Sequence, residues 1–137
     1  MPLRFRTAKL PLNVDSKENI VVLRVLLSGK KGVRLLKMVL DTEASITTIP
    51  TEVALAVGLD PSKPKKRIEM ITASGIEYVP VVMIPRIKLL GFMLKNVEAA
   101  CLNLPPQSLV SGLLGLNILS KFNLKLAFLK KFLELSR

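Results

Sequence analysis

The sequence predicts an all-β domain, a closed barrel or a sandwich, with one or two short helices. Short apolar runs rich in Val, Ile and Leu recur along the chain, and turn-forming segments with Gly, Pro, Asn or Asp separate them. Half of the 137 residues are hydrophobic but only 4% are aromatic, so the core must be built mainly from aliphatic side chains, which suit strands. This length fits one domain with a real core, and we expect residues 1–137 to form a single domain.

The first half of the chain is predicted to alternate strands with turns. We expect strands at residues 3–12, 20–27, 33–40 and 46–49, with a loop at 13–19 and a hairpin turn at 28–32. A short helix is expected at residues 50–59, because Leu55 and Leu59 are four residues apart and Gly58 is a natural C-terminal stop. A loop at residues 60–64 follows it.

The second half is predicted to open with a β-hairpin that has a Gly tip. Its strands are expected at residues 66–73 and 76–84; Pro85 then interrupts, and the chain continues extended to Leu90 before Gly91 turns it. The remaining elements are expected to be a strand at 92–102, a loop at 104–108, a short buried segment at 113–115, a helical turn or two at 116–121 and closing strands at 122–128 and 132–135.

The charge of the chain is strongly basic, with 21 Lys and Arg against 10 Asp and Glu, or +11. Such a balance fits either an anionic partner or a solubilised surface on a very apolar chain. The basic residues are spread out, Tyr78 is the one tyrosine, and basic and aromatic residues do not interleave as they do on a platform for single-stranded nucleic acid. The sequence therefore argues against nucleic acid as the main partner.

The chain has one cysteine, Cys101, and no histidine. A single cysteine cannot form an internal disulfide, and its apolar neighbours suggest a buried, small hydrophobic role. Without histidine, His-based triads, His-rich metal sites and His general bases are excluded, and with a single cysteine we expect no zinc site. The start of the chain lacks an apolar leader and no run is long enough to span a membrane, so we expect a cytoplasmic protein with no membrane partner.

An apolar strand that ends in Asp41 carries the first candidate site, and the loop after it holds Thr42, Glu43, Ala44 and Ser45. The strand fixes the backbone and thereby aims the carboxylate. Two carboxylates that share one proton can act as base and acid at the same pH. Because the chain has one such loop, a symmetric dimer would supply the second carboxylate across its two-fold axis. The alternative is structural, an Asp that makes an Asx turn with its own backbone.

Two later stretches belong to the same argument. The first is an apolar pair followed by a glycine, Leu113, Leu114 and Gly115, where the glycine is expected to allow close backbone packing. The second is the tip of the predicted hairpin, which consists of Thr72, Ala73, Ser74, Gly75 and Ile76.

Together these stretches resemble the retropepsin-like aspartic proteases. Residues 41–45 are similar to the Asp-Thr-Gly-Ala-Ser active-site loop of that family. Residues 113–119 are similar to its second motif, an apolar-apolar-Gly segment with a following helix, and residues 72–76 fall where the family has its flap hairpin. Order and spacing agree over about residues 20–134, and three motifs in order are more specific than any one alone.

The resemblance implies a closed, retropepsin-like acid protease barrel that forms a homodimer. One Asp41 from each subunit would flank a water molecule that attacks a peptide bond, and Thr42 would hydrogen-bond across the two-fold axis. Ser45 would support the loop, and the flap would close over an extended polypeptide substrate. The resemblance implies no metal and no organic cofactor.

Glu43 departs from the family pattern, which has Gly at this position. Glycine lets the backbone approach its neighbours without a Cβ, whereas Glu adds bulk and charge. A dimer would then hold four carboxylates near its axis, where like charges repel. Three interpretations remain open: the loop turns Glu43 outward, the protein has lost activity and kept binding, or the chain is an altered form of an active protease.

Three functions follow from these observations. The leading one is a homodimeric aspartic endopeptidase, with apolar substrate side chains beside the cleaved bond because the chain is rich in Leu, Val and Ile. The second is a catalytically impaired, protease-like homodimer that binds an extended peptide or acts as a scaffold. The third is a basic β-domain that binds nucleic acid, which would show as strongly salt-dependent retention on a polyanion.

Overall fold

The computed structural model describes residues 6–12, 14–15, 20–105 and 110–137. Within these residues the chain forms strands and two short helices, so the predicted all-β class is confirmed. The strands are β1 Thr7–Pro11, β2 Val14–Asp15, β3 Ile20–Gly29, β4 Gly32–Leu40, β5 Thr47–Ile49, β6 Lys66–Thr72, β7 Gly75–Leu89, β8 Phe92–Cys101, β9 Gly112–Leu114, β10 Asn123–Ala127 and β11 Phe132–Ser136. The helices are α1 Thr51–Ala56 and α2 Leu116–Leu119.

The elements agree with the sequence-based expectations apart from three details. Val14 and Asp15, expected in a loop, form the short strand β2, which pairs with β3. The helix predicted at residues 50–59 is shorter, because α1 ends at Ala56 and Gly58 then adopts a φ of 93° that ends it. Pro85 does not interrupt the chain, since β7 runs through it to Leu89. Pro85 stands opposite Asn96 at the one gap in the β7–β8 register, and it lies outside the parts of β7 that pair with β3 and β6. The parts of the predictions on residues 3–5, 13, 16–19 and 106–108 lie outside the described residues.

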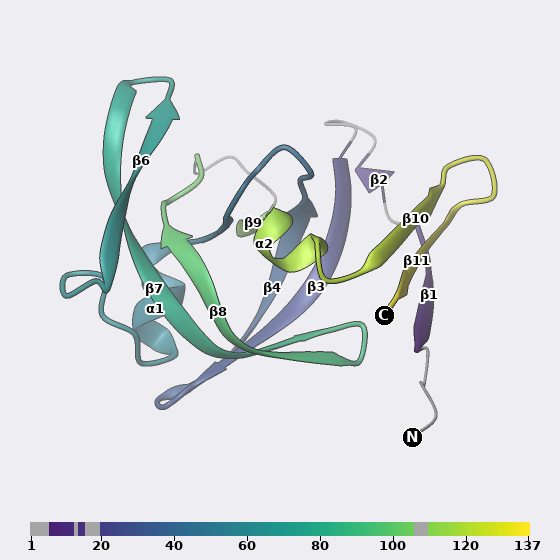
Figure 1. Ribbon diagram of the computed structural model, residues 1–137, viewed down its shortest axis with the longest axis horizontal. Helices are drawn as coiled ribbons and strands as arrows, with labels where there is room; N and C mark the ends of the chain where they lie inside the picture. The colour runs from purple at the N-terminus through teal and green to yellow at the C-terminus, as the bar shows by residue number, and fades with distance from the viewer. Residues whose placement is uncertain (1–5, 13, 16–19, 106–109) are drawn as a thin grey trace.

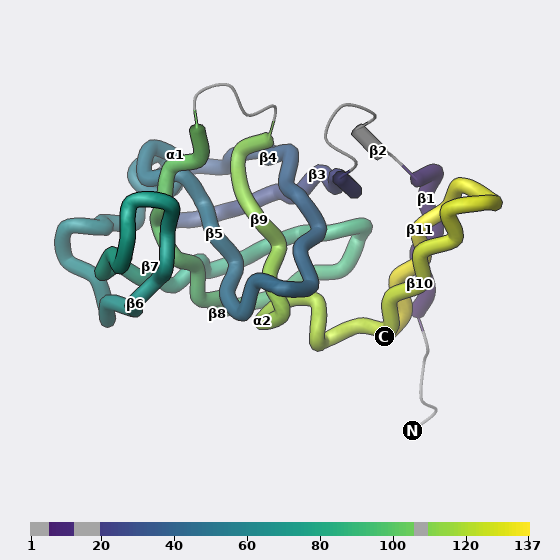
Figure 2. The backbone as a smooth tube through the Cα atoms, turned by 90° about the horizontal axis from the view of Figure 1, so that it is seen from above, coloured from purple at the N-terminus to yellow at the C-terminus, as the bar shows by residue number. Residues whose placement is uncertain are grey.

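The larger sheet has the strand order β2-β3-β4-β9-β5-β8-β7-β6. The sheet curls, because β3 pairs with β4 on one side and with β7 on the other (Figure 1). Strand β9 lies between β4 and β5, although it follows them by more than sixty residues in the chain. Figure 2 shows β4, β9 and β5 side by side. β9 is parallel to β4, and β5 is parallel to β8, whereas the hairpin pairs are antiparallel.

A smaller sheet joins the two ends of the described chain, in the order β1-β11-β10. It lies at one end of the molecule in both views (Figures 1 and 2). The backbones of Arg6 and Arg137 exchange two hydrogen bonds, of 3.2 and 2.9 Å. The Arg6 guanidinium lies 4.8 Å from the ring centroid of Phe92, so the smaller sheet contacts the turn between β7 and β8 through a cation–π interaction.

The core is aliphatic, as the composition predicts. Its largest fully buried side chains include Leu27, Met38, Ile84, Leu114 and Ile118, which come from β3, β4, β7, β9 and α2. Cys101 is buried as expected, and burial raises the pKa of its thiol to about 11. No helix in the described part of the chain is long and apolar enough to cross a membrane.

Candidate active site

Asp41 lies where the two predicted motifs meet. Its strand, β4, pairs in parallel with β9, with Leu40 opposite Leu114. The Asp41 N–H continues this ladder and donates to the Leu114 carbonyl at 3.0 Å. Two segments that are about seventy residues apart in sequence therefore hold the candidate catalytic carboxylate at the end of two inner strands of the sheet.

The loop after Asp41 is closed by local hydrogen bonds. The Glu43 N–H donates to Oδ1 of Asp41 at 3.0 Å, and the Ala44 N–H donates to the Asp41 carbonyl at 3.3 Å. This is the Asx-turn geometry that the sequence left open as a structural role. It does not exclude a catalytic one, because a half-buried carboxylate has two oxygens with several acceptor sites. The Leu116 N–H also donates to the Ala44 carbonyl at 2.7 Å, which fixes the loop to the start of α2.

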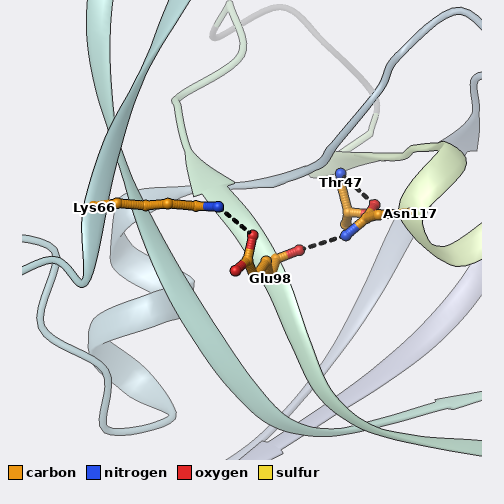
Figure 3. Close-up of polar contacts among 4 residues, drawn as sticks. All are labelled: Thr47, Lys66, Glu98 and Asn117. Carbon is orange, nitrogen blue, oxygen red and sulfur yellow. Dashed lines mark hydrogen bonds and ion pairs between the residues drawn. The ribbon is translucent and has the colours of Figure 1, made fainter.

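A hydrogen-bond network behind the loop joins β5, β8, β9 and α2. Oδ1 of Asn117 accepts from both the N–H and the hydroxyl of Thr47, each at 2.8 Å. The Asn117 side-chain amide donates to the Glu98 carbonyl at 2.7 Å, and the Gly115 N–H donates to the Thr47 hydroxyl at 3.1 Å. Figure 3 shows Asn117 between Thr47 and Glu98. Thr47 is fully buried, so its hydroxyl is both donor and acceptor without contact with water.

Gly115 has the close-packing role that the sequence predicts. A Cβ at this position would lie 2.6 Å from the Ile46 carbonyl oxygen and 2.8 Å from the Thr47 nitrogen. Both atoms belong to backbone, which cannot move aside as a flexible side chain can. The glycine therefore lets β9 and α2 approach the segment that leads from the candidate loop into β5.

The predicted flap is the hairpin of β6 and β7, which rises on the same upper side of the molecule as the loop between β4 and β5 (Figure 1). Thr72 pairs with Gly75, the Thr72 hydroxyl donates to the Gly75 carbonyl at 3.0 Å, and the Ser74 N–H donates to that hydroxyl at 3.2 Å. Gly75 has a φ of 113°, which favours glycine. Near the tip, Ile71 and Ile76 are 88% and 60% exposed.

A groove of about 340 Å³ separates the flap strand from the candidate loop. The loop side contributes Glu43, Ala44, Ser45 and Ile46, the sheet contributes Thr48 and Leu113, and β6 contributes Ile68, Glu69, Met70 and Ile71. An extended peptide in this groove would lie beside the loop that carries Asp41.

The structure thus brings the predicted loop residues and second motif together, and the groove connects them to the flap strand. Thr42, Glu43 and Ser45 are exposed. Three further residues take part in the site and were not predicted to do so: Thr47, Asn117 and Glu69. Thr47 and Asn117 are ordinary residues of a short strand and a short helix in the sequence, and only the tertiary structure makes them partners. In the described part of the chain, no group of three His, Cys, Asp or Glu side chains could hold a metal ion.

The comparisons with known proteins agree with this geometry. The family model described as "gag-polyprotein putative aspartyl protease" matches residues 28–121, which include the loop, the flap and the second motif. The fold is that of the retropepsin-like aspartic proteases, and the match gives the family. The chain belongs to that gag-polyprotein aspartyl protease family.

Two solved structures are similar to the chain. A retropepsin-like aspartic protease from Rickettsia conorii superposes with a TM-score of 0.73 at 20% identity, over 97% of this chain and 93% of that one. The protease of simian foamy virus (mac) gives a TM-score of 0.49 at 19% identity, over 72% of this chain and 91% of that one. No curated protein sequence matches the chain.

Proposed function

We propose that the chain is a homodimeric aspartic endopeptidase in which each subunit contributes Asp41. The observation that carries this proposal is the position of Asp41 at the β4–β9 junction, at the start of a loop whose residues 43–46 line a groove next to the flap strand β6. The chain has one Asp-Thr loop of this kind, whereas the reaction uses two carboxylates. A two-fold axis beside the loop supplies the second carboxylate, and Thr42 of each subunit hydrogen-bonds across that axis.

In this reaction one Asp41 is ionised and the other is protonated. The ionised carboxylate takes a proton from the water as the water oxygen bonds to the peptide carbonyl carbon, and the protonated carboxylate gives its proton to the carbonyl oxygen. The tetrahedral intermediate then collapses: the carboxyl that took the proton from water gives it to the leaving nitrogen as the C–N bond breaks, and the other carboxylate takes back the proton from a hydroxyl of the intermediate, so the pair again holds one proton. Because the pair shares one proton, we expect activity at acidic to neutral pH, with limits that belong to the pair.

The first test is a digest of an apolar-rich peptide mixture across about pH 3 to 7, the range in which such a pair titrates. The unchanged chain is compared with Asp41→Asn and Glu43→Gly. Cleavage that Asp41→Asn abolishes supports the proposal, and more cleavage by Glu43→Gly indicates that Glu43 slows the reaction. The proposal is overturned if the protein is folded and dimeric but cuts no peptide, both unchanged and as Glu43→Gly.

The second test separates two contributing subunits from one. When the unchanged chain and Asp41→Asn are mixed in equal amounts and allowed to exchange, random pairing leaves about one quarter of the dimers with both carboxylates. Specific activity per total chain should then fall to about one quarter of the unchanged value. A fall to about one half would indicate that each chain acts alone.

Glu43 favours a second candidate function, a protease-like homodimer that binds an extended peptide without cutting it. Glu43 is exposed and lines the groove, so two copies would add two charges close to the proposed axis. Repulsion among four carboxylates opposes the sharing of one proton that the reaction needs. Peptide binding by the unchanged chain without cleavage, together with cleavage by Glu43→Gly, would favour this function.

A further inference from the structure

The groove beside the candidate loop has a charge opposite to that of the whole chain. Its lining contains two acidic residues, Glu43 and Glu69, and no Lys or Arg. The chain as a whole has 21 basic residues against 10 acidic ones. Glu43 comes from the loop and Glu69 from the flap strand β6, so the two charges approach the groove from different walls.

The rest of the lining is mainly apolar and aliphatic. Ile46, Leu113, Ile68 and Met70 are half-buried along the groove. Along β6 the half-buried Ile68 and Met70 alternate with Glu69, so Glu69 projects from the exposed side of the strand, and Glu43 is also exposed. An apolar wall with carboxylates at its exposed rim matches a side chain with a long apolar stem and a cationic end. Lys and Arg have that structure, whereas Leu would leave both carboxylates without a partner and Glu would be repelled by them.

Thr48 adds an independent sign that the groove holds a ligand. Its residue is 1% exposed and lines the groove, and its hydroxyl has no hydrogen-bond partner among the described residues. Buried hydroxyls almost always have a partner, because an unpaired one loses its hydration without compensation. Because this hydroxyl is buried, a peptide in the groove can supply the missing N–H or C=O only when the lining residues shift on binding.

We propose that the groove selects polypeptides that carry a Lys or Arg close to the bound segment, with Glu43 and Glu69 as the specificity-determining residues. This inference rests on the proposed function in so far as the groove is the substrate site. It assigns a role to Glu43, the residue that replaces the glycine of the family loop. It also refines the expectation of purely apolar substrate side chains, because the apolar wall contacts the stem and the carboxylates contact the charge.

The test measures binding separately from cleavage. Fluorescein-labelled peptides of about eight residues, uncharged except at one position, carry Lys, Leu or Glu there, and the position is moved along the peptide. Fluorescence anisotropy with the Asp41→Asn variant reports affinity without turnover. At one or more positions we expect the Lys peptide to bind about five- to tenfold more tightly than the Leu peptide, and the Glu peptide to bind most weakly, with the preference decreasing at high salt.

Matched variants assign the preference to the two residues. Glu43→Gln and Glu69→Gln, each on the Asp41→Asn background, should reduce the Lys-over-Leu ratio severalfold and leave Leu-peptide affinity nearly unchanged. Glu77→Gln is the control, because Glu77 is an exposed acid on the same hairpin that does not line the groove. Equal affinity for Lys and Leu peptides at every position, or an equal effect of Glu77→Gln, overturns the inference.

The outcome remains distinct from that of the proposed function. If the unchanged chain cuts peptides but shows no preference for Lys or Arg, the specificity inference fails and the peptidase stands. If no peptide is cut but Asp41→Asn retains a Lys preference that depends on Glu43 and Glu69, the inference stands and the catalytic proposal fails.

Discussion

Two regions of the molecule are built in opposite ways. One is the junction behind the candidate loop, formed by Thr47, Gly115 and Asn117, and the other is the flap hairpin. At the junction, Thr47 is fully buried, Asn117 makes three hydrogen bonds, and a glycine allows backbone to pack on backbone. In the flap, β7 is the one described strand that pairs with β6, and large side chains are exposed at Ile71, Ile76 and Tyr78. The side chains of the junction make internal contacts, whereas those of the flap are exposed and can contact a bound peptide.

This difference separates the support of the site from the part that can adapt. A catalytic carboxylate needs a backbone fixed by neighbouring elements, and the junction provides it. A flap must open and close, and a hairpin with few buried contacts has low local stability. Substitutions in the junction should therefore change the free energy of unfolding, whereas substitutions at the flap tip should change peptide affinity alone.

The largest effect is expected for Gly115→Ala. The added Cβ would collide with backbone at Ile46 and Thr47, so the free energy of unfolding should fall by about 2–3 kcal/mol. Urea unfolding followed by circular dichroism measures this change. Ser74→Ala, at the exposed flap tip, is the control and should stay within about 0.5 kcal/mol. An unchanged stability for Gly115→Ala would mean that β9 and α2 do not pack on the loop as closely as described.

Asn117→Ala should have the next largest effect, about 2 kcal/mol, because it leaves the buried hydroxyl of Thr47 and the Glu98 carbonyl without their partner. Thr47→Val should cost about 1–2 kcal/mol by removing the same hydroxyl. In a double-mutant cycle, the sum of the stability losses of the two single variants should exceed the loss of the double variant by about 1 kcal/mol, which is the coupling energy of the pair. Strict additivity would show that the Thr47–Asn117 pair does not act as a unit.

Lys66→Met should have only a small effect on stability. The Lys66 ammonium lies 2.9 Å from a Glu98 carboxylate oxygen, at the base of the flap (Figure 3), but the Lys66 side chain is 50% exposed. Exposed ion pairs contribute about 0.2–1 kcal/mol and weaken with salt. Thermal unfolding at low and at about 1 M salt, where the Debye length is short, measures both values. A loss of stability well above this range would show that the ion pair stabilises the fold as strongly as the junction contacts do.

Ile71→Ser should leave stability unchanged within about 0.5 kcal/mol, because this side chain is 88% exposed. If the flap closes over a peptide and buries Ile71, peptide affinity in the anisotropy assay should fall about tenfold. Leu129→Ser is the matched control, since Leu129 is 95% exposed between β10 and β11 and does not line the groove. Equal losses of peptide affinity in both variants would show that Ile71 in the flap contributes no more to peptide binding than an exposed side chain far from the groove.

Much of this architecture could be predicted because it depends on local patterns. Turn residues and β-branched runs indicated the hairpin tip at Gly75 and the strand that ends at Asp41. The resemblance assigned residues 41–45 and 113–115 to one family pattern, and the β4–β9 pairing shows that the two stretches lie side by side. The continuous path through Pro85 could not be predicted, since it depends on the gap opposite Asn96.

The remaining parts of the site are tertiary. Nothing in the sequence near Thr47 indicates that Asn117, seventy residues later, accepts its hydrogen bonds. The charge of the groove is equally hidden, because Glu69 is one of several acids in a basic chain until the fold brings β6 to the loop. The sequence revealed Glu43 as an exception to a pattern, and the groove gives that exception a chemical context.

The position of β9 between β4 and β5 also sets the order of events when the protein is made. β4 leaves the ribosome with an open edge that only residues 112–114 can fill. At about 5–20 residues per second, this edge waits for roughly 4–15 seconds before its partner has been synthesised. Contacts of such high sequence separation also make folding slow. A nascent chain therefore cannot hold Asp41 in its final position until residues 112–114 have been translated, which delays any self-cleavage until then.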